Sequence, residues 1–390
     1  MSIASTAART STWRGALVRP LEALRAVVVP VVVARAVVLG ALGVAHLVIT
    51  HTAHHSPAIV FRVQQGLLAW DGGFYESIAR FGYQPLGHQA LRFFPLFPLV
   101  SRYLASASGA SDTVAVVLVA NVCAFVGTAA LWALVRRETR DIGLARTSAW
   151  LLSLAPPAFT FVLAYSEGML LVATTACFLC LRPRTANRPR WLWAGVFGYL
   201  GALTRPLGVL LVVPALVEML GGWRGATARG RLMMTVALAG PVAGLCTFLA
   251  WSQAVTGDFF LPLRVQTESG HHGAISDTFV NLYHDLSGAF HHHLGTAAHV
   301  PWVIVVVVLV VIAWFKLPAS YSLFCTAVVL VAVTGTNLDS FERYALSAFP
   351  LVIVGAMGLR STRVRTVILV LSGAAMFAYA LAAFLNALVP

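Results

Sequence analysis

The chain has 390 residues, of which 59% are hydrophobic and only 11% are charged, whereas about a quarter of the residues of a soluble domain are charged. These values exclude a soluble globular protein and predict an integral membrane protein. The net charge of +13 does not indicate a nucleic-acid partner, because the basic residues, almost all arginine, fall in short loops between apolar runs.

The apolar runs predict an all-α bundle, since many approach the roughly 20 residues of a spanning helix and none shows the alternation of a membrane strand. The first span is expected at 30–50, after an arginine-rich N-terminus that resembles an uncleaved signal-anchor. A long outer loop, 51–111, follows it. The next spans are expected at 112–135, 147–165 and 168–181.

The apolar run from Trp191 to Leu220 is interrupted by Thr204-Arg205-Pro206. Because proline disfavours helix at the preceding residue, we expect two short helices with Arg205 at the tip between them. Further segments are expected at 232–254, 300–315, 319–335, 345–359 and 366–386, with a second outer loop at 257–299. The total is about eleven membrane segments.

Most basic residues lie in loops on the same side as the N-terminus, which predicts that this side is cytoplasmic. The second outer loop holds His271, His272, His284, His291, His292, His293 and His299, without HExxH or a similar ligand spacing. The five cysteines lie in apolar runs and are expected to pack in the core. No metal site is predicted.

The first outer loop contains WDGGFYESIARFGY, in which Asp71 stands between an aromatic ring and two glycines. An interfacial carboxylate of this kind is a candidate general base, and the glycines would let a bulky substrate approach closely. The alternative is an Asp that caps the helix after it. Glu76 would point away from Asp71 on a regular helix, so we treat it as a candidate acceptor contact, with Trp70 and Tyr75 as substrate-binding aromatics.

The later motif RFFPLFPL alternates aromatic rings with prolines, and it predicts either a groove wall formed by Phe94 and Phe97 or an aromatic membrane anchor. Glu167 interrupts the apolar flow after Tyr165-Ser166. It is expected either to bind a sugar hydroxyl or to pair with an arginine such as Arg205.

Arg205 is a candidate phosphate ligand, because a guanidinium presents several donors and stays charged in a partly dry site. The alternatives are a snorkelling side chain or one that bonds carbonyls freed at the Pro206 break. Arg343 and Tyr344, in SFERYALSAFPL, offer a second cation and a ring to the same phosphate. Pairing of Arg343 with Asp339 or Glu342 is the ordinary alternative.

Six stretches in order resemble one family, the PIG-V-like mannosyltransferases, which are bacterial relatives of GPI mannosyltransferase II. They are WDGGFYESIARFGY, RFFPLFPL, AYSEGMLLVATTACFLCL, GALTRPLGVLLVVPALVE, TGDFFLPLRVQ and SFERYALSAFPL. Gly72-Gly73 departs from the eukaryotic members and weakens any transfer of acceptor identity.

The resemblance implies a single GT-C-type transmembrane domain over 1–390. Such an enzyme moves a sugar, here expected to be mannose, from a polyprenyl-phosphate donor to a lipid or glycan acceptor outside the cell membrane. The resemblance places the catalytic acid at Asp71. We predict an inverting displacement, and because the leaving group is already a phosphate, no cofactor is required; a divalent metal is compatible with such a site but is not predicted. A transporter or flippase for a lipid-linked sugar is the alternative, although the sequence shows no inverted repeat.

Overall fold

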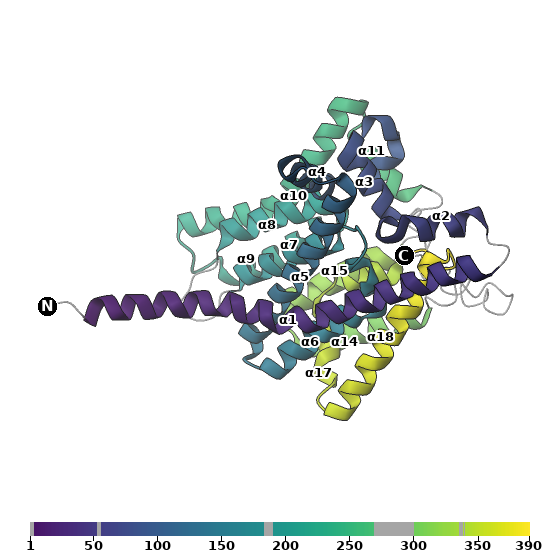
Figure 1. The fold of residues 1–390 in the computed structure, drawn as a ribbon. Coiled ribbons are helices and arrows are strands. Elements are labelled where there is room, and N and C mark those ends of the chain that lie inside the picture. Colours follow the sequence, from purple (N-terminus) through teal and green to yellow (C-terminus); the bar gives the residue numbers. More distant parts are fainter. Residues whose placement is uncertain (1–3, 53–55, 183–189, 269–299, 335–337, 339) are drawn as a thin grey trace.

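The protein, described here from a computed structural model, is mostly helical and has no strand in the residues that the structure describes, which are 4–52, 56–182, 190–268, 300–334, 338 and 340–390 (Figure 1). The helices of its first half are α1 (Ala4–His51), α2 (Pro57–Gln65), α3 (Asp71–Phe81), α4 (Leu96–Ser108), α5 (Asp112–Thr139), α6 (Ile142–Leu154) and α7 (Glu167–Leu181). Those of its second half are α8 (Trp191–Thr204), α9 (Val212–Gly222), α10 (Ala228–Thr256), α11 (Leu261–Arg264), α14 (Val300–Lys316), α15 (Ala319–Val333), α16 (Phe341–Leu346), α17 (Pro350–Gly358) and α18 (Thr362–Phe384).

Four of the described helices are long and apolar enough to cross a membrane: Pro20–His51 within α1, and the whole of α5, α10 and α18. Five more apolar stretches are shorter, at 167–181, 191–204, 206–222, 301–316 and 319–333. The structure therefore supports a helical membrane protein. It does not confirm the expected count of about eleven segments.

Two expected spans were wrong because prolines divide them. The span expected at 147–165 ends at Leu154, since Pro156 and Pro157 provide no backbone N–H and disfavour helix before them, and a 3-10 turn follows at Pro156–Phe161. The span expected at 345–359 is split between α16 and α17, with Pro350 at the start of α17. The first helix is also much longer than the expected span of 30–50.

The break expected at Arg205 is present. Helix α8 ends at Thr204, Arg205 is extended, and a 3-10 turn (Pro206–Leu211) leads into α9. The turn folds back closely on α8, because a Cβ at Gly208 would meet the backbone of Gly201. A glycine at this position thus allows the tight return that fixes Arg205 at the tip.

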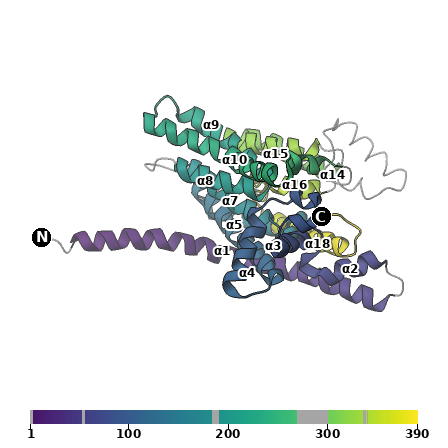
Figure 2. The same ribbon diagram turned by 90° about the horizontal axis from the view of Figure 1, so that it is seen from above.

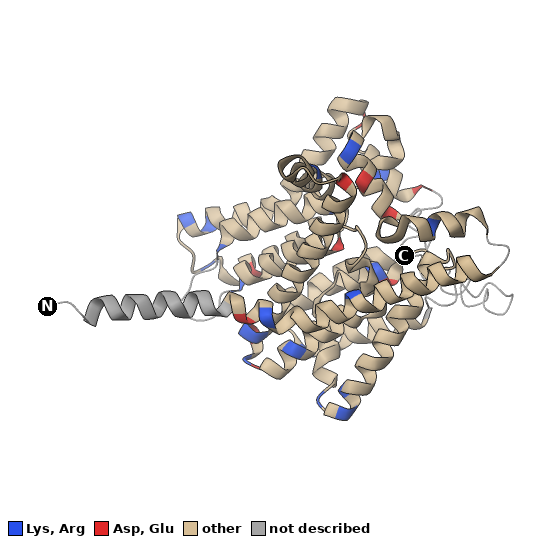
Figure 3. Cartoon of the chain, viewed as in Figure 1, with Lys and Arg blue, Asp and Glu red and all other residues tan. Residues whose placement is uncertain are grey.

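The helices that carry the outer-loop motifs gather at one end of the long helices. Figure 1 shows α3, α4 and α11 close together and α2 beside the end of α1, near the C-terminus. Figures 1 and 2 both show the start of α1 projecting on the opposite side of the molecule. Many basic residues lie at the loop ends toward the projecting start of α1 (Figure 3). This asymmetry is the kind on which the positive-inside rule relies, so a cytoplasmic N-terminus stays our prediction.

Candidate active site

A cavity of about 430 Å³ opens between two groups of segments. On one side lie α2, α3 and the turn that ends at Arg92, and on the other lie the break after α8 and the start of α16. The volume of the cavity lies within the range of small-molecule sites, about 300 to 1,000 Å³. The polar lining residues are Arg62, Asp71, Tyr75, Arg92, Thr204, Arg205, Gln266, Ser340, Arg343 and Tyr344, and the apolar ones include Trp70, Phe74, Phe93, Phe94, Leu207, Val331 and Ala332. Segments far apart in the sequence therefore bring four arginines to one cavity.

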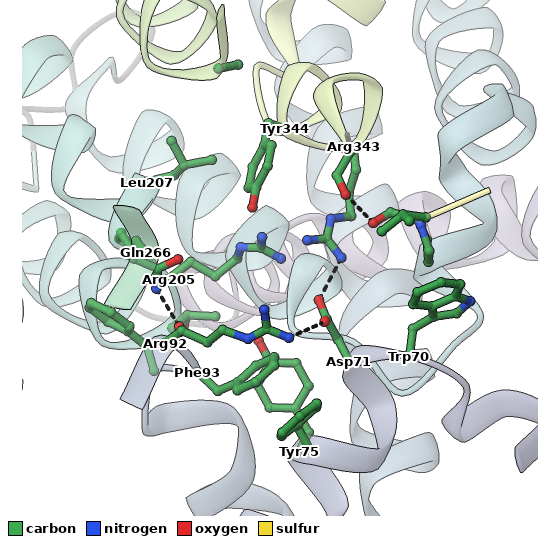
Figure 4. Close-up of a pocket in the computed structure, with 18 of the residues that line it drawn as sticks. Trp70, Asp71, Tyr75, Arg92, Phe93, Arg205, Leu207, Gln266, Arg343 and Tyr344 are labelled. Atoms are coloured by element: carbon green, nitrogen blue, oxygen red, sulfur yellow. Dashed lines mark hydrogen bonds and ion pairs between the residues drawn. The ribbon is translucent and has the colours of Figure 1, made fainter. Parts of the chain in front are cut away.

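Asp71 is the first residue of α3. Its carboxylate does not cap this helix, which was the alternative role expected from the sequence. The N-cap is Trp70, which makes no side-chain capping bond. The Asp71 carboxylate instead accepts a hydrogen bond of 2.7 Å from Nη1 of Arg343, and Nη2 of Arg92 lies 3.6 Å from its other oxygen (Figure 4). The side chain keeps 20% of its surface exposed, toward the cavity.

The backbone before Asp71 is held in an unusual conformation. Trp70 has a φ of 62°, a region that non-glycine residues seldom adopt. Its indole N–H donates to the carbonyl of Ala383 in α18 over 2.9 Å, and the N–H of Asp71 donates to the hydroxyl of Tyr165 over 3.3 Å. Strained residues of this kind persist where surrounding contacts fix them, and they cluster at functional sites.

Five charged residues form a chain of alternating sign, in the order Arg92, Asp71, Arg343, Glu167 and Arg205, which we call the ion chain. Nε of Arg343 lies 3.3 Å from Glu167, and Glu167 also accepts a hydrogen bond from Arg205. The ion chain joins α3, α7, α16, the tip after α8 and the 3-10 turn His88–Arg92. It holds three cations and two carboxylates, which leaves one positive charge for a bound anion.

Of the two roles expected for Glu167, the structure shows the pairing with Arg205. The Glu167 side chain is only 3% exposed and does not line the main cavity. The preceding residue, Ser166, hydrogen-bonds over 2.7 Å to the hydroxyl of Tyr75, which does line it. Glu167 therefore neutralises and orients Arg205 and Arg343 from behind the cavity wall.

Five polar cavity residues were not predicted as site residues from the sequence, namely Arg62, Arg92, Thr204, Gln266 and Ser340. The guanidinium of Arg92 lies 4.6 Å from the ring centre of Phe93 and 5.2 Å from that of Phe74, a geometry that favours a cation over an aromatic face. The side-chain amide of Gln266 donates to the Arg92 carbonyl over 2.7 Å and so fixes the turn that carries Arg92 (Figure 4). The sequence did contain one indication that Arg92 could belong to the site, because Arg92 is the cation within the RFFPLFPL motif.

Not every expected substrate contact reaches the cavity. Trp70, Tyr75 and Phe94 line it, but Phe97 is fully buried against Tyr75, because the outer-loop helices have a core of their own. Glu76 does not line it either and instead accepts a hydrogen bond from Thr113 at the start of α5.

The first glycine after Asp71 has a packing role in the fold, and the expected approach of a substrate stays a prediction. A Cβ at Gly72 would lie 3.3 Å from Cβ of Ala164, so this glycine lets α3 approach the segment before Tyr165. The seven histidines of the second outer loop all lie outside the described residues, so the structure does not test the expectation for that loop.

Burial alone would raise the pKa of Asp71, but the charges of Arg343 and Arg92 and the hydrogen bond from Arg343 outweigh it and lower that pKa below its ordinary value. A carboxylate with a lowered pKa in the folded state stabilises the protein above its unfolded pKa, about 3.9, and loses this contribution as the pH falls through the folded pKa. Asp71 is thus a carboxylate at neutral pH.

We expect the difference in thermal stability between wild type and Asp71→Asn in detergent to stay constant from about pH 7 to pH 5. It should shrink only below about pH 4. Thermal unfolding of both proteins across this series measures it. A difference that already disappears between pH 6 and pH 5 would show that the arginines do not hold the Asp71 carboxylate in its charged form.

Comparison with known families gives one partial match. Residues 94–251 match the family model of dolichyl-phosphate-mannose-protein mannosyltransferases. The matched part runs from the RFFPLFPL motif through most of α10 and includes Glu167 and Arg205, but it is less than half of the chain and contains neither Asp71 nor Arg343. No curated protein matches the sequence.

Three solved structures of the Archaeoglobus fulgidus oligosaccharyltransferase show a distant likeness. One, in complex with Zn and sulfate, is 11% identical, with a TM-score of 0.44, covering 80% of this chain and 48% of that one. Another, of AglB with an inhibitory peptide and a dolichol-phosphate, is 12% identical, with a TM-score of 0.41, covering 90% and 55%. The third, tethered to an acceptor peptide, is 13% identical, with a TM-score of 0.45, covering 90% and 56%. This chain thus spans about half the length of the structures it resembles.

Proposed function

We propose that the protein is a membrane glycosyltransferase of the GT-C class. It transfers a sugar, which we assign as mannose, from a polyprenyl phosphate to an acceptor hydroxyl outside the membrane. The observation that carries this proposal is the ion chain at the cavity, where a carboxylate stands among arginines. The partial match to dolichyl-phosphate-mannose-protein mannosyltransferases over 94–251 supports the class and the choice of mannose.

In the proposed reaction Asp71 is the general base, because its carboxylate is charged, faces the cavity and lies at the surface of the ion chain. The acceptor hydroxyl gives its proton to Asp71 as its oxygen attacks the anomeric carbon. The bond from that carbon to the phosphate oxygen breaks, and the oxygen keeps the electron pair. The configuration of the sugar is inverted because attack and departure occur on opposite faces.

Arg205 and Arg343 are proposed to bind the donor phosphate, together with the Tyr344 hydroxyl. Figure 4 shows Arg205, Arg343 and Tyr344 directed toward one region of the cavity, with Arg92 on its other side. Guanidinium groups already in place for the charge that builds on the leaving phosphate stabilise the transition state more than the bound donor. On this proposal the leaving group does not require a metal.

The same geometry links donor binding to the strength of the base. Arg343 and Arg92 are the cations with the largest effect in lowering the pKa of Asp71, and Arg205 adds to it, so the phosphate competes with the carboxylate for their charge. When both arginines turn toward the phosphate, the proton affinity of Asp71 rises. The base therefore becomes effective when a donor is present.

The experiment that tests the proposal is transfer of radiolabelled mannose from a polyprenyl phosphate in detergent, with purified protein and a lipid extract as acceptor source. We expect a labelled product to form without a sealed membrane, which a transporter or flippase would not give. A donor that remains unchanged under these conditions, while it moves across a sealed vesicle that contains the protein, would refute the glycosyltransferase.

A further inference from the structure

Arg62, in α2, is the cavity arginine that the ion chain does not include. Its guanidinium lies 4.0 Å from the ring centre of Trp70 and donates to the side-chain carbonyl of Gln65 over 3.2 Å. Among the residues that the structure describes, it forms an ion pair with no carboxylate. The charge of Asp71 attracts it only from beyond ion-pair distance. A half-buried cation in a cavity without a carboxylate in direct contact is a ready anion site, because it has already lost part of its hydration.

The place of Arg62 separates it from the proposed donor phosphate. It stacks on Trp70, and Figure 4 shows Trp70 and Arg205 on opposite sides of Asp71. In an inverting displacement the base accompanies the attacking hydroxyl, and the phosphate leaves in the other direction. An anion at Arg62 therefore belongs to the acceptor side of Asp71.

The surroundings of Arg62 indicate which anion would reach it. Helix α2 packs against α1 and α18, two of the four helices long enough to cross a membrane, just beyond the last turn of α1. Phe61, beside Arg62, is 56% exposed. A short helix with an exposed aromatic and an arginine at the end of a span is typical of the headgroup layer, where lipid phosphates are the abundant anions.

We infer that Arg62 and Trp70 form a second anion subsite, which binds the phosphodiester of a phospholipid acceptor. This inference rests on the proposed function for the direction of transfer, but the subsite itself does not depend on it. The fixed Trp70 ring, held by its bond to Ala383, keeps the Arg62 guanidinium in place. The acceptor hydroxyl would then lie between the subsite and Asp71.

The test counts anions bound to the purified full-length protein in an uncharged detergent, by titration calorimetry. The protein is first saturated with farnesyl phosphate, a short polyprenyl phosphate, which fills the donor site. It is then titrated with dibutyl phosphate, a phosphodiester of the acceptor type. We expect wild type to bind one further equivalent and Arg62→Gln to bind it about ten- to a hundredfold more weakly, the loss of a charged hydrogen bond.

Arg80→Gln is the matched control, because Arg80 also lies over an aromatic ring, at 5.0 Å from Phe81, but outside the cavity. It should bind dibutyl phosphate as wild type does, and Arg62→Lys should retain part of the affinity. Saturated wild type that binds no dibutyl phosphate, or Arg62→Gln that binds it unchanged, would overturn the subsite.

Tighter binding of inorganic phosphate than of dibutyl phosphate would overturn the assignment to a lipid headgroup. Failure of sugar transfer in the separate assay would overturn only the proposed function. The subsite would stand, since the titration of bound anions needs no turnover.

Discussion

Asp71→Asn is expected to reduce sugar transfer by about a hundred- to ten-thousandfold, the usual contribution of a general base. The amide cannot take the acceptor proton at any pH, but its oxygen can still accept the hydrogen bond from Arg343. Since Arg343 keeps Glu167 at 3.3 Å as a second partner, the fold should persist. Initial rates with a radiolabelled polyprenyl phosphate donor, together with thermal unfolding in detergent, measure both effects.

The same substitution should strengthen binding of the donor phosphate, because one competitor for Arg343 and Arg92 is removed. The control is Glu76→Gln on the same helix, whose carboxylate faces Thr113 and not the cavity. That variant should keep transfer and phosphate affinity close to wild type. Turnover of Asp71→Asn at the wild-type rate would refute Asp71 as the base.

The sequence was sufficient to predict the features that depend on local chemistry. The break at Arg205 followed from Pro206, and α3 lies where a helix was expected after Asp71. The same reasoning was available at Pro156-Pro157, where a single span was expected and a 3-10 turn is found. That error came from treating the whole apolar run as one helix and giving too little weight to the two prolines.

The partners of the charged residues were not predictable in the same way. Arg343 was expected to bind phosphate, with pairing to a neighbour in its own loop as the alternative. The structure pairs it with Asp71 and Glu167, 272 residues and more than a hundred residues earlier in the chain. Such contacts depend on how the broken segments pack, and no local pattern encodes them. The pairing of Glu167 with Arg205 was foreseen as an option because both interrupt apolar runs.

The aromatic motif shows the limit of assigning roles from composition. Phe94 and Phe97 were expected to line the same groove, but Phe94 reaches the cavity and Phe97 packs in the outer-loop core against Tyr75. The motif begins at Arg92, and this arginine is the residue of the motif that pairs with Asp71. A carboxylate expected to act in a partly dry site requires a nearby cation, and the sequence offered Arg92 as one candidate.

Arg205 was expected either to bind the donor phosphate or to support the chain break at Pro206. The variants Arg205→Gln and Glu167→Gln distinguish these two roles. If Arg205 binds the leaving phosphate, its loss should lower transfer by about a hundred- to a thousandfold, as for other preorganised charges at a transition state. Arg205 lines the cavity and Glu167 does not, so Glu167→Gln should reduce transfer much less. Its main effect should be on thermal stability, because it leaves a buried arginine less well paired.

Arg205→Lys provides the matched control, because it retains the charge and loses the planar fork that binds phosphate through two donors. It should recover only part of the rate, with a weaker affinity for polyprenyl phosphate. The rates and the donor affinities of the three variants decide between the roles. Equal losses of rate in Arg205→Gln and Glu167→Gln, with donor affinity unchanged in both, would show that Arg205 only supports the break at Pro206 and that the phosphate is bound elsewhere in the cavity.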